Sequence, residues 1–417
     1  MLDFVNGFAC YERKAQIDLE LLRTNLRARP RMPLWQELLR AIEDQQPVTG
    51  LTHNFYKYPA RFSPSFARQI VLAFSSPGDL VFDPFMGGGT TLVEARALGR
   101  RGAGTDISSL AVFLTDTKTS IFSTGELRRI ESWTKRLVPK LNLHKPSSRN
   151  HDWEDSGYLR NISGRKTWAV RKLLEMALSA VRQFDSDREQ KFVRCALLRT
   201  AQWALDCRED IPPVHEVRAR FMVVVREMVE GARQFAKETR KGGCADVLCL
   251  HRSAVGIEDD SRITELGHPA LILTSPPYPG VHVLYHRWQV LGRRETPAPF
   301  WIAGTLDGAG ASYYTFGDRK NVPRYYEVAR EAFASVARVC SRKTVVAQMV
   351  AFSEPEWQLR DYLEAMQDSG FKEISFPELA NRRDGRVWRS VPNRKWYADK
   401  MGATAGSKEV VLFHKLS

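Results

Sequence analysis

Residues 78–108 of this 417-residue chain read GDLVFDPFMGGGTTLVEARALGRRGAGTDIS. The apolar run Leu80–Asp83 predicts a buried strand, and the glycines after it predict a tight turn. A helix is predicted over Thr90–Leu98 and a second strand over Gly102–Asp106. A strand, a turn, a helix and a strand in this order form the repeating unit of a parallel α/β sheet. We therefore expect an α/β fold whose central sheet is mostly parallel.

The glycine-rich turn lies where parallel sheets bind their ligands, at the carboxyl end of the first predicted strand. Three consecutive glycines let the backbone approach a ligand closely, and the helix start after them offers free N–H groups to an anion. Asp83 is placed to hold a cationic group. Asp106 follows Gly87 by nineteen residues, which is about the spacing of the acid that binds ribose hydroxyls in nucleotide-binding folds. The alternatives are a purely structural turn and a helix-capping role for Asp106. The turn is not a P-loop, because no lysine follows the glycines.

Helix-like periodicity replaces the strand patterns over residues 121–243. This segment carries nine more Lys and Arg than Asp and Glu, which is most of the net charge of +14. Strand-like and helix-like runs alternate again after it, so we expect one α/β domain interrupted by a basic helical insertion. The expected parts are a helical extension at 1–49, a first α/β part at 50–120, the insertion at 121–243 and a second α/β part at 244–417.

The composition excludes several classes of protein. Hydrophobic residues make up 43% of the chain and charged residues 26%, which is typical of a globular protein. No apolar run approaches the ~20 residues of a membrane helix, and the N-terminal residues lack the apolar segment of a secretory signal. The six cysteines form no Cys-x-x-Cys pair, so we expect reduced thiols, a cytosolic protein and no metal site. The positive charge favours a polyanionic partner such as nucleic acid.

A second motif, LILTSPPY at 271–278, is a buried strand that runs into two prolines and an aromatic residue. The prolines fix the backbone at the exit from the sheet. The Ser275 hydroxyl and the Pro276 carbonyl can then accept hydrogen bonds from one amine, and Tyr278 can stack on a flat ring. The alternative is a proline-terminated strand with Tyr278 in the core.

The two motifs together resemble a known family. DPFMGGGTT and TSPPY are similar to the DPFxGSGTT and [DNS]PP[YF] motifs of the S-adenosylmethionine-dependent DNA amino-methyltransferases. HNFYKYPARFSPSFARQIV at 53–71 resembles the segment before the cofactor loop of that family, and EVVLFHK at 409–415 resembles its last strand. The resemblance covers about 53–110 and 240–417, and it implies a Rossmann-like class I methyltransferase fold.

The resemblance also implies roles for individual residues. Asp83 would bind the methionine amino group, Asp106 the ribose hydroxyls and Asp246 the adenine amine, although Cys244-Ala245 stands where the family has a glycine. The expected cofactor set is Tyr58, Pro59, Ala60, Arg61, Phe62, Asp83, Pro84, Phe85, Gly87, Gly89, Thr90, Thr91, Asp106 and Asp246. The expected catalytic set, which would hold the target base, is Ser275, Pro276, Pro277 and Tyr278.

The implied reaction is methyl transfer to the amine of a base that has left the duplex. In the resembled family, Ser at the first position of the SPPY turn is usually associated with N4 of cytosine, and Asp or Asn with N6 of adenine. We therefore expect a cytosine-N4 methyltransferase, with adenine N6 as the alternative. An RNA base methyltransferase and a non-catalytic DNA-binding protein are the rival hypotheses.

Two segments are expected to contact double-stranded DNA. The basic insertion lies between the two halves of the domain, where the family has its target-recognition region. Residues 382–400 hold seven Lys and Arg with aromatic residues between them, and the expected contacts are Arg382, Arg383, Arg386, Arg389, Arg394 and Lys395. A solvated helical cap and a surface loop are the alternatives for these two segments. The resemblance further implies a bacterial or phage-host cytosol and a possible partner restriction nuclease; it leaves the oligomeric state open.

Overall fold

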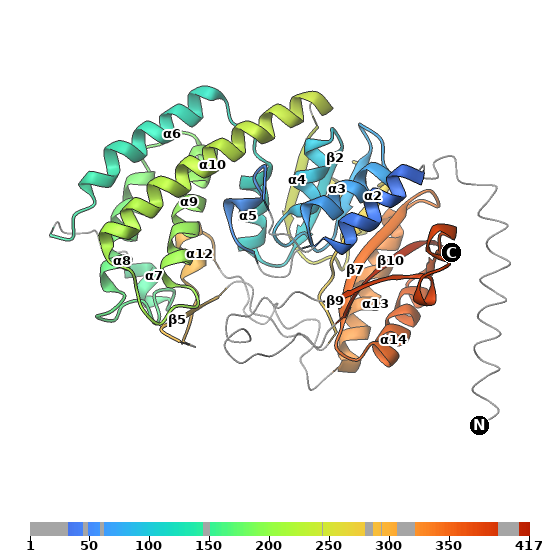
Figure 1. Cartoon of the computed structure of the whole chain (residues 1–417). Helices are drawn as coiled ribbons and strands as arrows, with labels where there is room; N and C mark the ends of the chain where they lie inside the picture. Colours follow the sequence, from blue (N-terminus) through green and yellow to red (C-terminus); the bar gives the residue numbers. More distant parts are fainter. Residues whose placement is uncertain are drawn as a thin grey trace.

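A central eight-stranded sheet organises the chain (Figure 1). The computed structural model describes residues 32–44, 49–58, 62–144, 151–243, 245–279, 287–292, 294–306, 322–390 and 408–417. The sheet order is β3-β2-β1-β4-β7-β10-β8, and β9 pairs with β10. The strands are β1 (Leu80–Asp83), β2 (Arg101–Asp106), β3 (Val247–His251), β4 (Leu271–Thr274), β7 (Val345–Phe352), β8 (Phe371–Glu373), β9 (Val387–Ser390) and β10 (Lys408–Leu416).

The strand directions confirm the predicted sheet. β1 pairs in parallel with β2 and β4, β2 with β3, and β4 with β7. Among the described strands of this sheet, the antiparallel pairs are those that β10 forms with β7, β8 and β9. Because the parallel strands run in one direction, the carboxyl ends of β1, β2, β3 and β4 meet at the same edge of the sheet.

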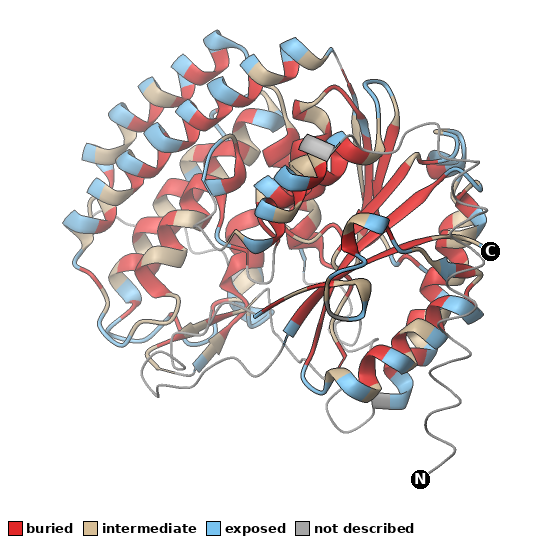
Figure 2. Cartoon of the chain, turned by 45° about the vertical axis from the view of Figure 1, so that its right-hand side comes forward, coloured by how far each residue is buried: buried red, intermediate tan, exposed pale blue. Residues whose placement is uncertain are grey.

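Both faces of the sheet are covered, which explains why its strands are nearly continuous apolar runs. Every residue of β1, β4 and β7 is buried. Val81 and Leu271 pack on one face with α2 (Met32–Glu43) and α3 (Pro64–Phe74). Phe82 and Ile272 pack on the other face, which is covered by α13 (Val322–Val339) and α14 (Pro355–Asp368). Figure 2 shows the strands buried along their length and the helices buried mainly on one side.

A helical body lies beside the sheet (Figure 1). It contains α6 (Thr124–Leu137), α7 (His151–Asp155), α8 (Trp168–Val181), α9 (Asp187–Leu205) and α10 (Val214–Gly242). The helices α4 (Thr90–Ala97) and α5 (Ser109–Thr119) lie between β1, β2 and this body, and α10 packs against α4. α10 ends in tight contact with the turn after α4, because a Cβ at Gly99 would lie 1.8 Å from the Gly242 carbonyl oxygen.

Residues that follow the SPPY turn in the sequence also pack in the helical body. β5 (Trp288–Val290), β6 (Arg294–Thr296) and α12 (Ala298–Ala303) follow that turn, and Trp288, Phe300 and Trp301 share one apolar core with α8, α9 and α10. The Trp288 indole N–H donates to the buried Tyr56 hydroxyl at 2.9 Å. This differs from the sequence division, which assigned all of 244–417 to the α/β part.

The helices of the described residues lack a membrane-spanning candidate. None of them is both long and apolar enough to cross a bilayer.

Candidate functional site

The glycine turn joins β1 to α4 at the carboxyl edge of the sheet. Gly87 and Gly89 have φ of 45° and 76°, in the left-handed region that favours glycine. The Gly87 N–H donates to Asp106 Oδ2 at 2.9 Å, and the Met86 N–H donates to the Thr105 carbonyl at 3.1 Å. The turn that follows β1 is therefore held directly against the end of β2.

Two carboxyl groups lie at this edge: Asp83 is buried and Asp106 is half-buried. Thr274 Oγ1 donates to Asp83 Oδ1 at 2.7 Å, and the Phe85 N–H donates to the same oxygen at 3.1 Å. Burial raises the pKa of Asp83 to about 6. Burial also raises the pKa of Asp106 to about 6, although the Ser108 and Gly87 N–H groups partly offset it. Carboxyl groups with raised pKa at the edge of a sheet are typical of a binding site for a cationic or hydroxyl-bearing ligand.

Two residues of α5 that were not among the expected cofactor residues stabilise the glycine turn. Buried Lys118 on α5 donates from Nζ to the Gly88 carbonyl at 2.7 Å, and Thr115 Oγ1 donates to the Gly87 carbonyl at 3.2 Å. The sequence reasoning missed both residues. The available signal was spacing: Lys118 follows Leu110 and Leu114 at steps of four, so it lies on the buried face of its helix.

Tyr58 covers the other side of the turn and is buried. A Cβ added at Gly88 would lie 2.9 Å from the Tyr58 Cβ, which explains why a glycine stands where the resembled family has serine. Phe62, by contrast, packs in the core of the α3 face with its ring centroid 5.3 Å from that of Phe66. Of the expected cofactor residues in this segment, Tyr58 lies at the turn, Phe62 does not, and Pro59, Ala60 and Arg61 lie outside the described residues.

The remaining predicted residues of the turn are part of the same assembly. Pro84 accepts a hydrogen bond from Thr105 Oγ1 at 2.8 Å, and the Phe85 ring packs edge-on against Phe333. Thr90 and Thr91 are buried at the start of α4. Thr91 Oγ1 donates to the Leu273 carbonyl at 3.0 Å, so its hydroxyl ties α4 to β4.

The SPPY turn lies next to the glycine turn, because β4 pairs with β1. Ser275 Oγ lies 3.0 Å from the Tyr278 hydroxyl, and that hydroxyl lies 3.3 Å from Glu409 Oε1 on β10. Tyr325 on α13 donates to the Pro277 carbonyl at 2.7 Å, and Pro276 is buried. The Thr274–Asp83 bond joins the two motifs across 191 residues of sequence.

Asp246 is not brought to this site. It precedes β3, and its carbonyl accepts from Gly102 at the start of β2, so it lies at the amino edge of the sheet. The expectation that it contacts adenine is therefore wrong for this geometry. The carboxyl end of β3 instead carries His251, which pairs in register with Asp106 and whose Nε2 lies 2.9 Å from the Ile107 carbonyl oxygen.

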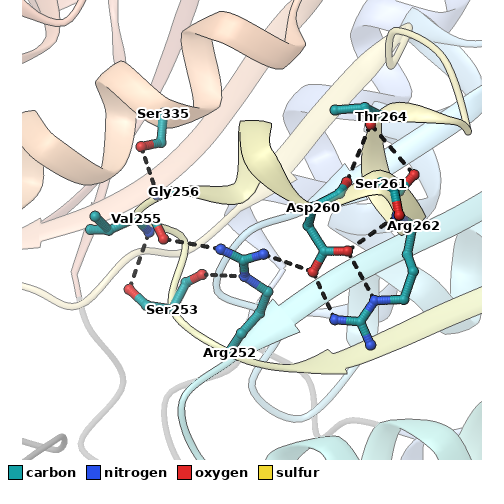
Figure 3. A network of polar contacts seen from close by, with 9 residues as sticks. All are labelled: Arg252, Ser253, Val255, Gly256, Asp260, Ser261, Arg262, Thr264 and Ser335. Atoms are coloured by element: carbon teal, nitrogen blue, oxygen red, sulfur yellow. Dashed lines mark hydrogen bonds and ion pairs between the residues drawn. The ribbon is translucent and has the colours of Figure 1, made fainter.

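The loop after β3 is fixed by a charged network (Figure 3). Arg252 and Arg262 both bind Asp260 Oδ2, each at 2.7 Å, and these bonds hold the pKa of Asp260 well below its usual range. The Gly256 N–H donates to Ser335 Oγ on α13 at 2.9 Å. Both arginines of this network are paired with the Asp260 carboxylate, so we assign the network a structural role in the loop. The glycine turn and the SPPY turn remain as the candidate ligand contacts.

Three of the arginines expected to bind DNA form ion pairs, which leaves them less available to phosphates than the sequence prediction assumed. Arg386 binds both oxygens of Glu373, each at 2.7 Å. Arg389 is 8% exposed, and its Nε donates to Glu409 Oε2 at 2.6 Å. Arg382 lies 2.9 Å from Glu43. The side chain of Arg383, together with Arg394 and Lys395, lies outside the described residues.

Neither a metal site nor a reactive thiol is found in the described part of the chain. No group of three His, Cys, Asp or Glu side chains there could hold a metal ion. Burial raises the pKa of the four described cysteines to about 12, so their thiols stay protonated at neutral pH and are poor nucleophiles. These cysteines are Cys195, Cys207, Cys249 and Cys340.

Comparison with known proteins gives partial matches. Residues 12–114 match the N6/N4 methyltransferase family model, described as DNA methylase. The chain is 31% identical over 102 residues to the type II methyltransferase M.MjaII of Methanocaldococcus jannaschii, covering 24% of this chain and 18% of that protein. It is 37% identical over 96 residues to the type II methyltransferase M.MvaI of Kocuria varians, covering 22% and 21%. It is 39% identical over 62 residues to the DNA adenine methyltransferase YhdJ of Escherichia coli, covering 15% and 21%. The matches thus span about a fifth of the length of these relatives.

Proposed function

Since residues 12–114 belong to the amino-methyltransferase family of DNA methylases, we propose that this chain transfers a methyl group from S-adenosylmethionine to an exocyclic amine of a DNA base. The observation that carries the proposal is the hydrogen bond from Thr274 to Asp83. It joins the glycine turn, which suits the methyl donor, to the SPPY turn, which suits the acceptor amine. Positioning two reactants side by side is the main requirement of such a transfer.

The residues at the glycine turn fit the proposed methyl donor. The buried carboxyl of Asp83 suits the methionine amino group, and the half-buried carboxyl of Asp106 suits the ribose hydroxyls. The glycines leave no side chain between the backbone and the ligand, and the start of α4 favours the methionine carboxylate. When bound, S-adenosylmethionine supplies a methyl group on a positively charged sulfur.

The SPPY turn supplies acceptors for the amine that receives the methyl group. Ser275 Oγ and the Pro276 carbonyl would each accept an amine N–H, which draws the nitrogen lone pair out of the ring and toward the methyl group. The target base would leave the duplex to reach them, at a cost of a few kcal/mol that stacking on Tyr278 offsets. No strong base and no covalent intermediate are needed, which agrees with the protonated thiols.

The base proposed is cytosine, modified at N4, because serine stands at the first position of the turn. Adenine N6 is the second candidate, because one relative is a DNA adenine methyltransferase. Two other relatives are type II methyltransferases, so we further propose modification of a specific sequence within a restriction-modification or similar system, in a bacterial or phage-host cytosol. A partner restriction nuclease belongs to the same proposal.

The helical body is proposed to contact the DNA. On α6, Arg128, Lys135 and Arg136 are exposed and form no ion pair with any described residue. Arg128 and Arg136 line one surface pocket together with Trp133 and Phe184. Unpaired cations of this kind neutralise phosphates.

The test is methyl transfer from labelled S-adenosylmethionine to unmodified genomic DNA, followed by mass spectrometry of the nucleosides. We expect 4-methylcytosine, and the Asp83→Ala variant should yield none. 6-Methyladenine would keep the enzyme class and discard the base assignment. Label in RNA alone would replace the DNA proposal with an RNA base methyltransferase, and no transfer at all would overturn the proposed activity.

A further inference from the structure

A chain of four polar groups leads from the SPPY turn into the core. Ser275 Oγ lies 3.0 Å from the Tyr278 hydroxyl, and the Tyr278 hydroxyl lies 3.3 Å from Glu409 Oε1. Glu409 Oε2 accepts from Arg389 Nε at 2.6 Å. Glu409 is 3% exposed and Arg389 is 8% exposed, and Arg389 also donates to the Ile42 carbonyl at 3.0 Å. A buried ion pair is therefore connected to the turn that carries the proposed catalytic residues.

The number of protons that each group carries determines which group donates in each hydrogen bond of this series. A carboxylate held by a guanidinium has only acceptor sites, so the Tyr278 hydroxyl must donate to Glu409. The Tyr278 hydroxyl has one proton and has given it to Glu409, so in the contact with Ser275 it can only accept. Ser275 must therefore donate its own single proton to Tyr278, and its oxygen faces the site with lone pairs alone.

We propose that Glu409, ion-paired with Arg389, is a positioning residue that orients the Tyr278 and Ser275 hydroxyl protons, so that Ser275 meets the target amine as a hydrogen-bond acceptor. This inference rests on the proposed function, which it deepens. It also means that Ser275 does not donate to a ring nitrogen of the base as long as its hydroxyl donates to Tyr278. Burying an ion pair costs desolvation free energy, so such a pair adds little to stability. Orienting the two hydroxyl protons is a function that would account for it.

The activity test compares four variants. Glu409→Gln removes the charge and lets an amide N–H donate to Tyr278, which frees the Tyr278 proton and lets Ser275 turn into a donor. Tyr278→Phe keeps a stacking ring and removes the acceptor for the Ser275 proton. We expect both to lower kcat about tenfold or more, with KM for DNA and for S-adenosylmethionine within about twofold of wild type. Arg389→Lys retains a cation beside Glu409 and should recover part of the kcat that Arg389→Met loses.

A matched control is present at the same antiparallel end of the sheet. Glu373 on β8 forms a two-bond ion pair with Arg386, and among the described residues no hydrogen bond or ion pair joins it to the SPPY turn. Glu373→Gln should leave kcat within about twofold of wild type. If Glu409→Gln and Tyr278→Phe also keep wild-type kcat, or if they lower kcat no more than Glu373→Gln does, the inference is overturned.

A second readout does not need methyl transfer. The phenol at position 278 is replaced with 3-fluorotyrosine, and its ionisation is followed by ¹⁹F NMR. The nearby carboxylate opposes ionisation, so the titration midpoint should fall in Glu409→Gln and stay unchanged in Glu373→Gln. A shifted midpoint in a protein that methylates nothing would refute the proposed function and keep the coupling between Glu409 and Tyr278. An unshifted midpoint refutes the inference in either case.

Discussion

At the scale of single residues, Asp83 and Asp106 make the site sensitive to pH. Burial raises the pKa of each from 3.8 to about 6, so both groups are partly protonated in mildly acidic solution. Because each pKa is higher in the folded than in the unfolded state, the protonated groups add to the free energy of unfolding. This contribution is complete below about pH 4 and is lost as the pH rises through about 6. The same ionisation prepares the site for a cationic ligand. The free protein and its proposed complex should therefore respond to pH in opposite directions.

We predict that the affinity for S-adenosylmethionine rises from pH 5 to pH 7, by up to about tenfold for each unit and each group that must ionise. Isothermal titration calorimetry at pH 5, 6, 7 and 8 measures this rise, and Asp106→Asn should bind more weakly with a shallower dependence. In the free protein, the melting temperature should fall over the same pH range, and it should fall less in Asp106→Asn. A wild-type affinity that is flat from pH 5 to pH 7 would contradict the assignment.

The residues near the two motifs could be predicted because each motif is local. Asp83 and Asp106 are the last residues of their strands, and Ser275 directly follows another strand, so chain position alone puts them at one edge of a parallel sheet. Glu409 could not be found in this way. It lies in an antiparallel strand 131 residues from Tyr278, and only the tertiary structure brings the two together.

At the scale of elements, the glycine turn and α5 depend on each other. Gly89 has a φ of 76° and no space for a side chain, because an added Cβ would lie 2.6 Å from Thr115 Oγ1. We predict that Gly89→Ala lowers the free energy of unfolding by about 2 kcal/mol or more and abolishes cofactor binding, since both the backbone and α5 would have to move. Chemical denaturation and calorimetry measure the two effects.

The control for this prediction is Gly78→Ala. Gly78 has a φ of 86° but has no atom within 4 Å of an added Cβ, so the substitution should cost only the backbone strain, about 1 kcal/mol, and leave cofactor binding intact. Equal losses in the two variants would show that strain alone matters and that the contact with Thr115 does not.

Element boundaries explain the failure at Asp246. The family resemblance implied an acid at the end of a strand, whereas β3 begins one residue after Asp246 and runs to His251. Shifting a strand by a few residues moves a side chain from one edge of the sheet to the other, because the two edges are about 16 Å apart for five residues. The packing of β5, β6 and α12 in the helical body could not be predicted either, because it depends largely on contacts with α9, which ends more than 80 residues before β5.

At the scale of the whole molecule, net charge alone did not locate the proposed DNA-binding surface. The arginines of 382–389 form a conspicuous cluster in the sequence, yet the structure pairs Arg386 with Glu373 and Arg389 with Glu409. These acids lie in other strands, so counting charges along the segment could not reveal them. The cations available to phosphates must instead be those with no carboxylate nearby, and α6 carries three of them among the described residues.

We predict that the double variant Arg128→Ala/Arg136→Ala binds duplex DNA more weakly and lowers the slope of log Kd against log salt by about 2, one for each lost phosphate contact. Affinity for S-adenosylmethionine should stay unchanged, because α6 lies in the helical body, apart from the glycine turn (Figure 1). The control is Arg382→Ala, whose guanidinium is already paired with Glu43 and whose loss should leave the slope within about 0.5 of wild type. Fluorescence anisotropy over a series of salt concentrations measures all three proteins. A slope that falls for Arg382→Ala and not for the double variant would move the DNA surface from the helical body to the edge of the sheet.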